Sequence, residues 1–377
     1  MRAALSLALR SAVLASIGLV VAACSSTPDK PKPRVLDPLT PQNVARPAWN
    51  QRIAGVQFPL TVAVAGKSFT VGANDGTVLA LDADSGRELW RANVGSPLGA
   101  GVGSDGRFAA VVTRSGELVT LEAGQAKWRK PVGTRVATAP FVAGERVFVL
   151  GVDRSVQAFD ALDGKKLWSL QRPGDPLTLA QSGVLGAYKD TLIVGQGPRL
   201  AGIDPLAGTV RWELPIGAPR GANEVERLAD LVGPVLRTGN ILCARAFQAS
   251  VGCVDADRST LSWTKNVGGT DAIGGDRDYV FGADASDRMT AWRTDSGVVA
   301  WTSEALLNHG LSAPAVLGNS VVFGAADGTV HWLSRDKGEV QLRLPTDGSA
   351  IVAPPVVSGG TLLVVTRTGG LYAFRTP

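Results

Sequence analysis

The sequence predicts an all-β protein, an eight-bladed β-propeller of four-stranded antiparallel blades, and two observations support that prediction. Glycine accounts for 45 of the 377 residues, about 12% against an average of about 7%, without the triplet period of collagen. A strand–turn–strand–turn–strand unit that ends in Trp also recurs along the chain. Hydrophobic residues reach 45% and charged residues only 19%, and the chain has three Cys. This composition excludes a disordered chain and a disulfide-dense scaffold.

Residues 1–23 have the composition of a secretory signal. They contain Arg2 and Arg10, no acidic residue, and an apolar second half that is too short for a membrane-spanning helix. Val21-Ala22-Ala23-Cys24 resembles the bacterial lipobox, in which a small residue precedes the cysteine that is lipidated after cleavage. We predict a lipoprotein signal peptide and lipidation of Cys24. The alternative is an ordinary signal peptide followed by a chance cysteine.

The stretch after the signal has the composition of a tether. Ser25-Ser26 follow the cysteine without an Asp, which resembles the sorting pattern of outer-membrane lipoproteins rather than inner-membrane ones. Six Pro lie between residues 25 and 48, and such a segment is extended and semi-rigid. We therefore predict a lipidated, Pro-rich tether over residues 24–41 and a single propeller over residues 42–377.

The repeat is clearest over residues 71–90, VGANDGTVLALDADSGRELW. A strand is followed by a turn at Asn74-Asp75-Gly76, which supplies the positive φ of tight hairpins, and by an alternating strand, a second Asp/Gly turn and a strand with Trp. A Gly, or Ser259 in one copy, precedes each repeated Trp by four residues. The series consists of Trp90, Trp128, Trp168, Trp212, Trp263 and Trp301.

Two further positions bring the blade count to eight. Gly338 predicts a Trp at position 342, where Leu342 stands. Trp49 has no preceding strands of its own, whereas residues 350–377 supply three strands and no final Trp strand. We predict that the strand of Trp49 completes the last blade and closes the ring, which also hides edge strands. One Trp per repeat at a fixed phase is what packing between blades requires; a ligand-stacking series is the alternative.

Residues suited to catalysis are few. The segment 101–106 matches G-x-G-x-x-G, but a strand follows it, so we interpret it as a turn. His309 in a loop and His331 in a strand have no nearby nucleophile and are expected to be satisfied structural residues. We expect no enzyme activity, no cofactor and no metal. Acids without calcium-ligand spacing are interpreted as solvated loop residues: Asp271, Asp276, Asp278, Asp284 and Asp287.

Cys243 and Cys253 flank a predicted hairpin. A three-residue turn at 247–249 would place them directly opposite each other, and exported proteins fold in an oxidising compartment. One interpretation is a cross-strand disulfide. The other is ordinary packing, because neighbouring blades fill the equivalent positions with small or apolar residues.

The repeat resembles that of pyrroloquinoline-quinone (PQQ) dehydrogenases. The lipobox, the eight repeats and four stretches resemble more specifically the BamB family, lipoproteins of the outer-membrane β-barrel assembly machinery. Those stretches are PLTL (176–179), NEVERLAD (223–230), SEALLNHGLSAPAVLGNSVVFGAADGTVHWL (303–333) and GGLYAF (369–374).

The resemblance implies a non-enzymatic scaffold that binds the periplasmic POTRA domains of BamA and assists folding and insertion of outer-membrane proteins. Unfolded outer-membrane proteins would be further partners. It also implies a monomer within a hetero-complex, anchored by lipid to the periplasmic face of the outer membrane of a Gram-negative bacterium. Loss of the signal lowers the formal net charge from +5 to +3, and without a Lys/Arg stripe we expect no nucleic-acid partner.

Two connections between blades are predicted to be the longest, about 15 residues after Trp168 and about 22 after Trp212. Because such connections emerge on one face of a four-stranded propeller, both loops should lie side by side there, and long loops usually carry function. In the BamB family these loops contact BamA, and the sequence departs from the family pattern at Ala180 and Val232. The predicted partner-binding residues are Leu177, Leu179, Glu224, Arg227, Leu228 and Asp230.

The sequence leaves three alternatives open for the role of the loops and of the chain. The leucines of the two loops could fold back onto the blades instead of binding a partner. The chain could be a PQQ-dependent quinoprotein dehydrogenase, although it has no adjacent cysteines and no recognisable calcium ligands. It could also be a periplasmic propeller of the cell envelope that binds a sugar or a peptide, which a ligand in the central channel would favour.

Overall fold

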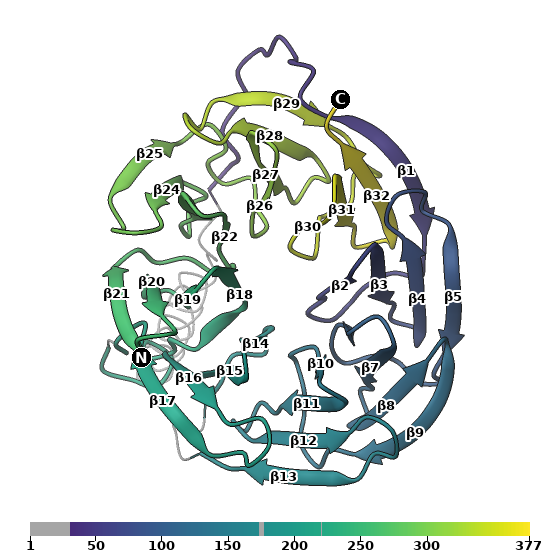
Figure 1. Ribbon diagram of the computed structural model, residues 1–377. Coiled ribbons are helices and arrows are strands. Elements are labelled where there is room, and N and C mark those ends of the chain that lie inside the picture. Colours follow the sequence, from purple (N-terminus) through teal and green to yellow (C-terminus); the bar gives the residue numbers. More distant parts are fainter. Residues whose placement is uncertain (1–30, 173–176, 220) are drawn as a thin grey trace, which may run out of the picture. The chain divides into compact units, whose positions relative to one another are not determined.

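The computed structural model describes residues 31–172, 177–219 and 221–377, and residues 34–377 form one compact unit. Within the described residues every regular element is a β-strand, and the 32 strands form eight four-stranded antiparallel sheets. The sheets are arranged as the blades of a ring (Figure 1). The predicted eight-bladed propeller is confirmed. No helix in the described part of the chain is long and apolar enough to cross a membrane.

Each blade runs from an inner strand to an outer one. Blades 1 to 4 comprise β2 (Ala63–Ala65), β3 (Ser68–Gly72), β4 (Thr77–Asp82) and β5 (Glu88–Asn93); β6 (Gly103–Ser104), β7 (Phe108–Val112), β8 (Glu117–Glu122) and β9 (Gln125–Pro131); β10 (Phe141–Ala143), β11 (Arg146–Leu150), β12 (Val156–Asp160) and β13 (Lys166–Leu170); and β14 (Leu185–Tyr188), β15 (Thr191–Gln196), β16 (Arg199–Ile203) and β17 (Val210–Pro215).

The second half of the ring repeats this order. Blades 5 to 8 comprise β18 (Leu231–Thr238), β19 (Ile241–Ala246), β20 (Ser250–Asp255) and β21 (Thr260–Lys265); β22 (Gly274–Gly275), β23 (Tyr279–Ala283), β24 (Met289–Arg293) and β25 (Val299–Ser303); β26 (Ala315–Leu317), β27 (Ser320–Gly324), β28 (Val330–Ser334) and β29 (Val340–Leu344); and β30 (Val356–Ser358), β31 (Thr361–Val365) and β32 (Gly370–Arg375) with β1 (Arg46–Arg52).

The two ends of the chain close the ring in blade 8. β1 pairs with β32 antiparallel, and Trp49 lies opposite Ala373. The outer strand of the last blade thus comes from the N-terminal side of the chain, as the Trp count predicted. Figure 1 shows β1 lying along β32 next to blade 1.

The repeated Trp side chains join neighbouring blades. The indole Nε1 of Trp49, Trp128 and Trp301 each donates a hydrogen bond to a carbonyl in the next blade, at Ala83, Ala161 and Arg335 over 2.8–3.0 Å. The ring covers the repeat glycine of that next blade: a Cβ on Gly86 would lie 2.4 Å from Trp49. The packing interpretation of the Trp series is confirmed.

Trp212 is the exception. Its neighbour in blade 5 is Ser259, the one repeat position that is not Gly, and Ser259 has a φ of 52°. The Trp212 ring lies instead over Gly202 of its own blade, where a Cβ would be 2.3 Å away. The one repeat in which Gly is replaced is thus the one whose preceding Trp ring lies over its own blade.

The hydrophobic core lies between the blades. The second strand of each blade is almost entirely buried, as in β7 and β31, whereas the outer strands are largely exposed. Apolar clusters join each pair of adjacent blades; Phe148 of blade 3, for example, packs with Leu192 and Val194 of blade 4. The ring is therefore stabilised by interfaces between consecutive repeats.

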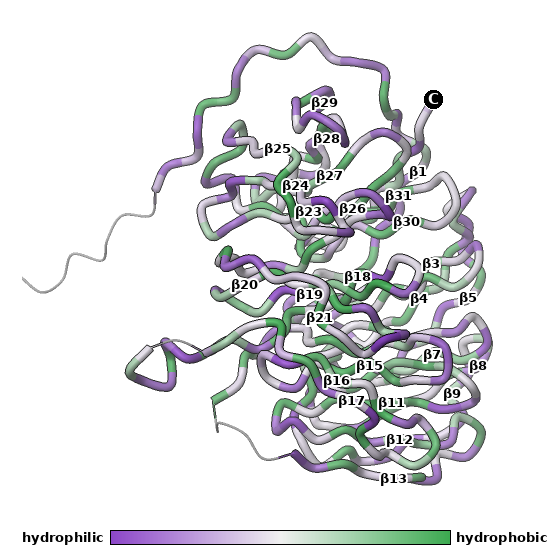
Figure 2. Tube along the Cα trace, turned by 60° about the vertical axis from the view of Figure 1, so that its left-hand side comes forward, coloured by the Kyte–Doolittle hydropathy of each residue, from purple (hydrophilic) through white to green (hydrophobic). Residues whose placement is uncertain are grey.

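Residues 34–45 form a strap that reaches β1 along blade 7 (Figures 1 and 2). The Arg34 amide donates to the Leu307 carbonyl at 2.9 Å, and the Arg34 carbonyl accepts from His309 Nε2 at 2.9 Å. Leu36 packs on the core between blades 6 and 7. Arg34 and Leu36 therefore contact the ring. Both residues lie inside the segment 24–41, which the sequence predicts as a tether.

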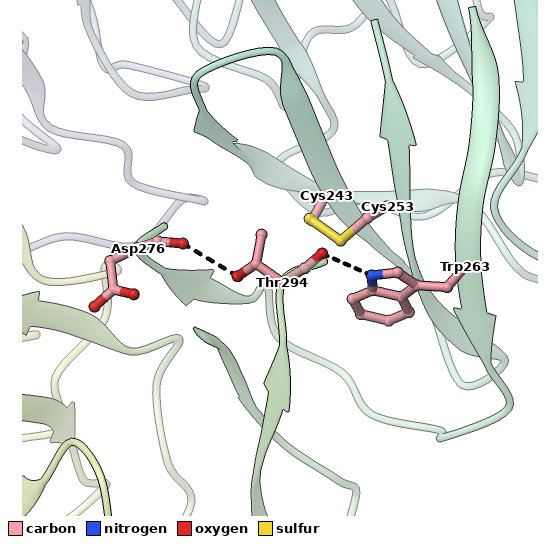
Figure 3. The surroundings of a disulfide bond; sticks show 5 residues. All are labelled: Cys243, Cys253, Trp263, Asp276 and Thr294. Carbon is pink, nitrogen blue, oxygen red and sulfur yellow. Dashed lines mark hydrogen bonds between the residues drawn. A yellow bond between two sulfur atoms is a disulfide. The ribbon is translucent and has the colours of Figure 1, made fainter. Parts of the chain in front are cut away.

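Cys243 and Cys253 face each other across β19 and β20, and they are joined by a disulfide with a Cα–Cα distance of 4.0 Å. Both are fully buried, and Cys253 lies opposite Trp263 of the outer strand. In Figure 3 the disulfide lies beside the Trp263 indole, whose Nε1 donates to the Thr294 carbonyl of blade 6 at 2.9 Å. The crosslink therefore joins the two central strands of blade 5 at its contact with blade 6.

Candidate functional site

The connections between blades and the turns after each second strand emerge on one face, because the strands of a blade alternate in direction. Six of these connections have 8 to 11 residues, whereas residues 171–184 have 14 and residues 216–230 have 15. We call these the first and second long loops. The second is shorter than predicted, since β18 begins at Leu231 and not near Pro234.

The two long loops meet at Asp230. Its carboxylate accepts from the Leu179 backbone amide at 2.9 Å and from Arg154 Nη2 at 3.3 Å. A bridge between Gly183 and Val232 continues the contact. The sequence prediction that both loops lie side by side is confirmed.

The apolar residues of the first loop are placed differently from each other. Leu179 is half-buried and packs against Val232, Ala272 and Ala313. Leu177 has 36% of its surface exposed. Leu179 therefore folds back onto the blades and anchors the loop, which is the alternative to partner binding named above. Leu177 is exposed to solvent.

The tip of the second loop is a compact turn. Glu226 accepts from the Ala222 amide at 2.8 Å and from Asn223 Nδ2 at 2.9 Å, and its own amide donates to Asn223 Oδ1 at 2.9 Å. Glu224 and Arg227 are exposed around this turn, and Leu228 is half-buried at its base. Local hydrogen bonds thus give the tip a defined shape.

Sequence reasoning missed Arg154 and Val225. Arg154 lies 76 residues from Asp230, in a turn of another blade, and no local spacing links the two. Val225 is 69% exposed within a charged segment. An apolar residue between charged ones is the sequence signal that identifies it as a candidate for partner binding. Of the two departures from the family pattern, Val232 is buried in β18 and Ala180 is exposed.

We call the exposed part of the two loops, comprising Leu177, Glu224, Val225 and Arg227, the two-loop surface. Apolar side chains surrounded by charged ones are typical of a binding surface. Asp230, Arg154 and Leu179 lie beneath it and fix the loops relative to each other.

The other polar residues singled out in the sequence have structural roles. His309 is bonded to the strap, but neither ring nitrogen of the buried His331 has a hydrogen-bond partner among the described residues, so the expectation of two satisfied histidines is wrong for His331. Asp287 is buried and accepts from the amides of Gly310 and Leu311. The expectation of solvated acids is therefore wrong for Asp287. Asp276 is paired with Arg335.

Metal-ligating side chains and the G-x-G-x-x-G segment are the remaining candidates for chemistry in the sequence. No three His, Cys, Asp or Glu side chains among them are grouped to hold a metal ion. The G-x-G-x-x-G segment runs through β6 into a turn before β7, in which Asp105 accepts from the amides of Arg107 and Phe108.

Solved structures share this fold. BamB from Moraxella catarrhalis superposes with a TM-score of 0.80 at 21% identity, over 88% of this chain and 100% of that one. Quinohemoprotein alcohol dehydrogenase from Comamonas testosteroni superposes with a TM-score of 0.67 at 16% identity, over 88% of this chain and 76% of that one. At these identities the likeness concerns the fold alone.

Sequence comparison is more specific. The family model described as outer membrane protein assembly factor BamB matches residues 74–303. The outer membrane protein assembly factor BamB of Bordetella pertussis is 35% identical over 375 residues, 97% of each chain. Both the family model and this relative carry the description of an assembly factor. The chain therefore belongs to the BamB family of outer membrane protein assembly factors.

Proposed function

We propose that this chain is a non-enzymatic scaffold of the outer-membrane protein assembly complex that binds the POTRA domains of BamA through the two-loop surface. It would assist the folding and insertion of outer-membrane β-barrels as a monomer within the complex. Family membership supports the assembly role. The observation that supports the binding surface is the junction at Asp230, which holds two long loops together from separate blades.

Pre-ordering of the loops favours binding. Ordering an interface on association costs free energy for each side chain or loop that becomes immobile. Here the first loop is bonded to Asp230 and packed through Leu179, and the tip of the second loop is closed by Asn223 and Glu226. A partner would therefore meet described side chains that are already ordered around Asp230 and around Asn223 and Glu226.

Within the surface, Leu177 and Val225 are the apolar anchors and Glu224 and Arg227 the charged rim. Truncation of buried apolar anchors usually dominates the loss of binding, while rim charges mainly affect association rate and salt dependence. Asp230 and Arg154, which lie beneath, are positioning residues.

The test is binding of purified chain to the POTRA domains of BamA. Val225→Asp and Leu177→Asp are each expected to weaken binding at least about tenfold, because a charge replaces an apolar anchor. Asp230→Ala is expected to weaken it as well, with the propeller still folded, because the loops separate. Leu206→Asp is the matched control: Leu206 is 66% exposed, in the same ring but in a turn on the opposite face.

Unchanged affinity in Val225→Asp, Leu177→Asp and Asp230→Ala, or an equal loss in Leu206→Asp, would contradict the proposed surface. We also propose that Cys24, which lies outside the described residues, carries the lipid that holds the chain on the periplasmic face of the outer membrane. Cys24→Ser should then move the protein from the membrane fraction to the soluble fraction.

A further inference from the structure

Two clefts open on the loop-bearing face and share one ridge, Gln57-Phe58-Pro59. The first cleft lies over blades 1 to 3, and its charged lining residues are Arg114 and Arg135. The second lies toward blades 6 to 8, and Asp271, Asp284, Asp287 and Arg367 line it. The two clefts therefore differ in the sign of their charge. We call the first the basic cleft and the second the acidic cleft.

The acids of the acidic cleft are accounted for by the fold. Arg245 of β19 is fully buried, and burial lowers its pKa to about 10, so it stays charged at neutral pH. Asp271 and Asp284 are the nearby negative charges that favour its protonated form. Asp287 binds the amides of Gly310 and Leu311. These carboxylates balance a buried cation and order a loop.

No such structural role explains the basic cleft. Arg135 is exposed, and its guanidinium has no partner among the described residues. Arg114 is exposed and donates one hydrogen bond, from Nη2 to Asn74 Oδ1 at 2.9 Å, which leaves its other donors available. No Asp or Glu is among the residues that line the cleft. Two guanidinium groups thus face a space with no counter-charge in its walls.

The walls of the basic cleft suit a polypeptide. Phe58 of the ridge is half-buried, and Pro59 and Val136 add apolar surface, so the cleft combines two cations with an apolar wall. A Cβ on Gly133 would meet nothing within 4 Å. The cleft is open on this side, and an extended chain could lie along it.

We propose that the basic cleft binds an acidic, extended polypeptide segment. Arginine recognises carboxylates through paired, charge-assisted hydrogen bonds. The acidic cleft across the ridge has no such pair of arginines without a counter-charge, so the segment is expected on the basic side of the ridge. A pocket beneath the two long loops is lined by Leu179 and Asp230. Val152 and Ala137 line both this pocket and the basic cleft. An acidic segment can therefore lie beside a partner on the two-loop surface.

The proposal is tested by fluorescence anisotropy with the full mature chain and a labelled peptide of alternating Glu and Ser. The same peptide with Gln for Glu, or with Lys for Glu, tests the dependence on charge. Arg135→Glu with Arg114→Glu is expected to weaken binding of the acidic peptide at least about tenfold, because charge-assisted hydrogen bonds are lost and repulsion replaces them.

Arg277→Glu is the matched control, since Arg277 is exposed in the turn between β22 and β23 on the opposite face. It should leave peptide binding unchanged, although the net charge changes in the same sense. Arg135→Gln, which removes the charge without reversing it, should give an intermediate loss. Circular dichroism of each variant verifies that the propeller is intact.

Three outcomes would overturn the proposal: no binding of the acidic peptide, equal binding of the Gln peptide, or an equal loss in Arg277→Glu. Arginine-dependent binding to phosphatidylglycerol vesicles without binding to the peptide would assign the cleft to lipid headgroups instead. The proposal is independent of the POTRA surface, because Val225→Asp should leave peptide binding unchanged. Failure of one surface is thereby distinguished from failure of the other.

Discussion

At the scale of single residues, His331 shows how the packed interior limits stability in acid. Burial is the main cause that lowers its pKa, to about 4 from 6.5, and the charge of His309 adds to the effect. Its ring lies 6.0 Å from that of His309. The folded state therefore keeps His331 neutral over a range in which the unfolded chain binds a proton.

The sign of the resulting pH dependence follows from this shift. Above pH 6.5 His331 is neutral in both states, and below it the unfolded state gains the proton first. The free energy of unfolding should therefore fall by ~3 kcal/mol as the pH drops from 6.5 to 4. Urea unfolding at several pH values should show this loss in the unmodified protein and a smaller one in His331→Leu. Parallel curves for the two proteins would contradict the assignment.

At the scale of the element, the outer strand of one blade is docked on the turn of the next by Trp against Gly. Gly338 has a φ of 71°, and a Cβ there would lie 2.4 Å from the Trp301 ring. Gly359 has a similar φ of 58°, but a Cβ there would meet nothing within 4 Å. Comparison of the two positions therefore separates the cost of a side chain at a positive φ from the cost of displacing the Trp301 ring.

Gly338→Ala should lower the free energy of unfolding by about 2–4 kcal/mol, because it adds a displaced indole to the cost of a positive φ. Gly359→Ala should lose only the backbone part, about 1–2 kcal/mol. Chemical denaturation of both variants measures the difference. Equal losses would mean that the Trp301 ring relaxes without cost.

At the scale of the whole molecule, stability depends on closure by β1. A chain that starts at Arg46 lacks the strap but keeps β1, and it should form a closed ring. A chain that starts at Ile53 leaves β32 with an unpaired edge, and exposed edges promote self-association. Light scattering and thermal unfolding should therefore find a monomer in the first case and a less stable, associating protein in the second. Identical behaviour would show that closure contributes little.

The repeat made the fold predictable, because Gly and Trp at a fixed phase encode a local turn and a contact with the next repeat. The positions of the two long loops followed from their lengths. The role of Asp230 did not, because Arg154 approaches it from another blade and the carboxylate points inward to the Leu179 amide. The burial of Asp287 and the unpartnered ring of His331 likewise depend on distant segments, which local patterns do not reveal.

The docked strap sets a limit on where a tethered molecule can work. Arg34 is bonded to Leu307 and His309, in the connection 304–314, which emerges on the same face as the two long loops. Ten residues of chain lead from Cys24 to Arg34, so a lipid on Cys24, as proposed, could lie no more than ~35 Å from that point of the ring. The loop-bearing face would then meet its partners in a shallow layer next to the bilayer, because the docked strap fixes the point at which the tether leaves the ring.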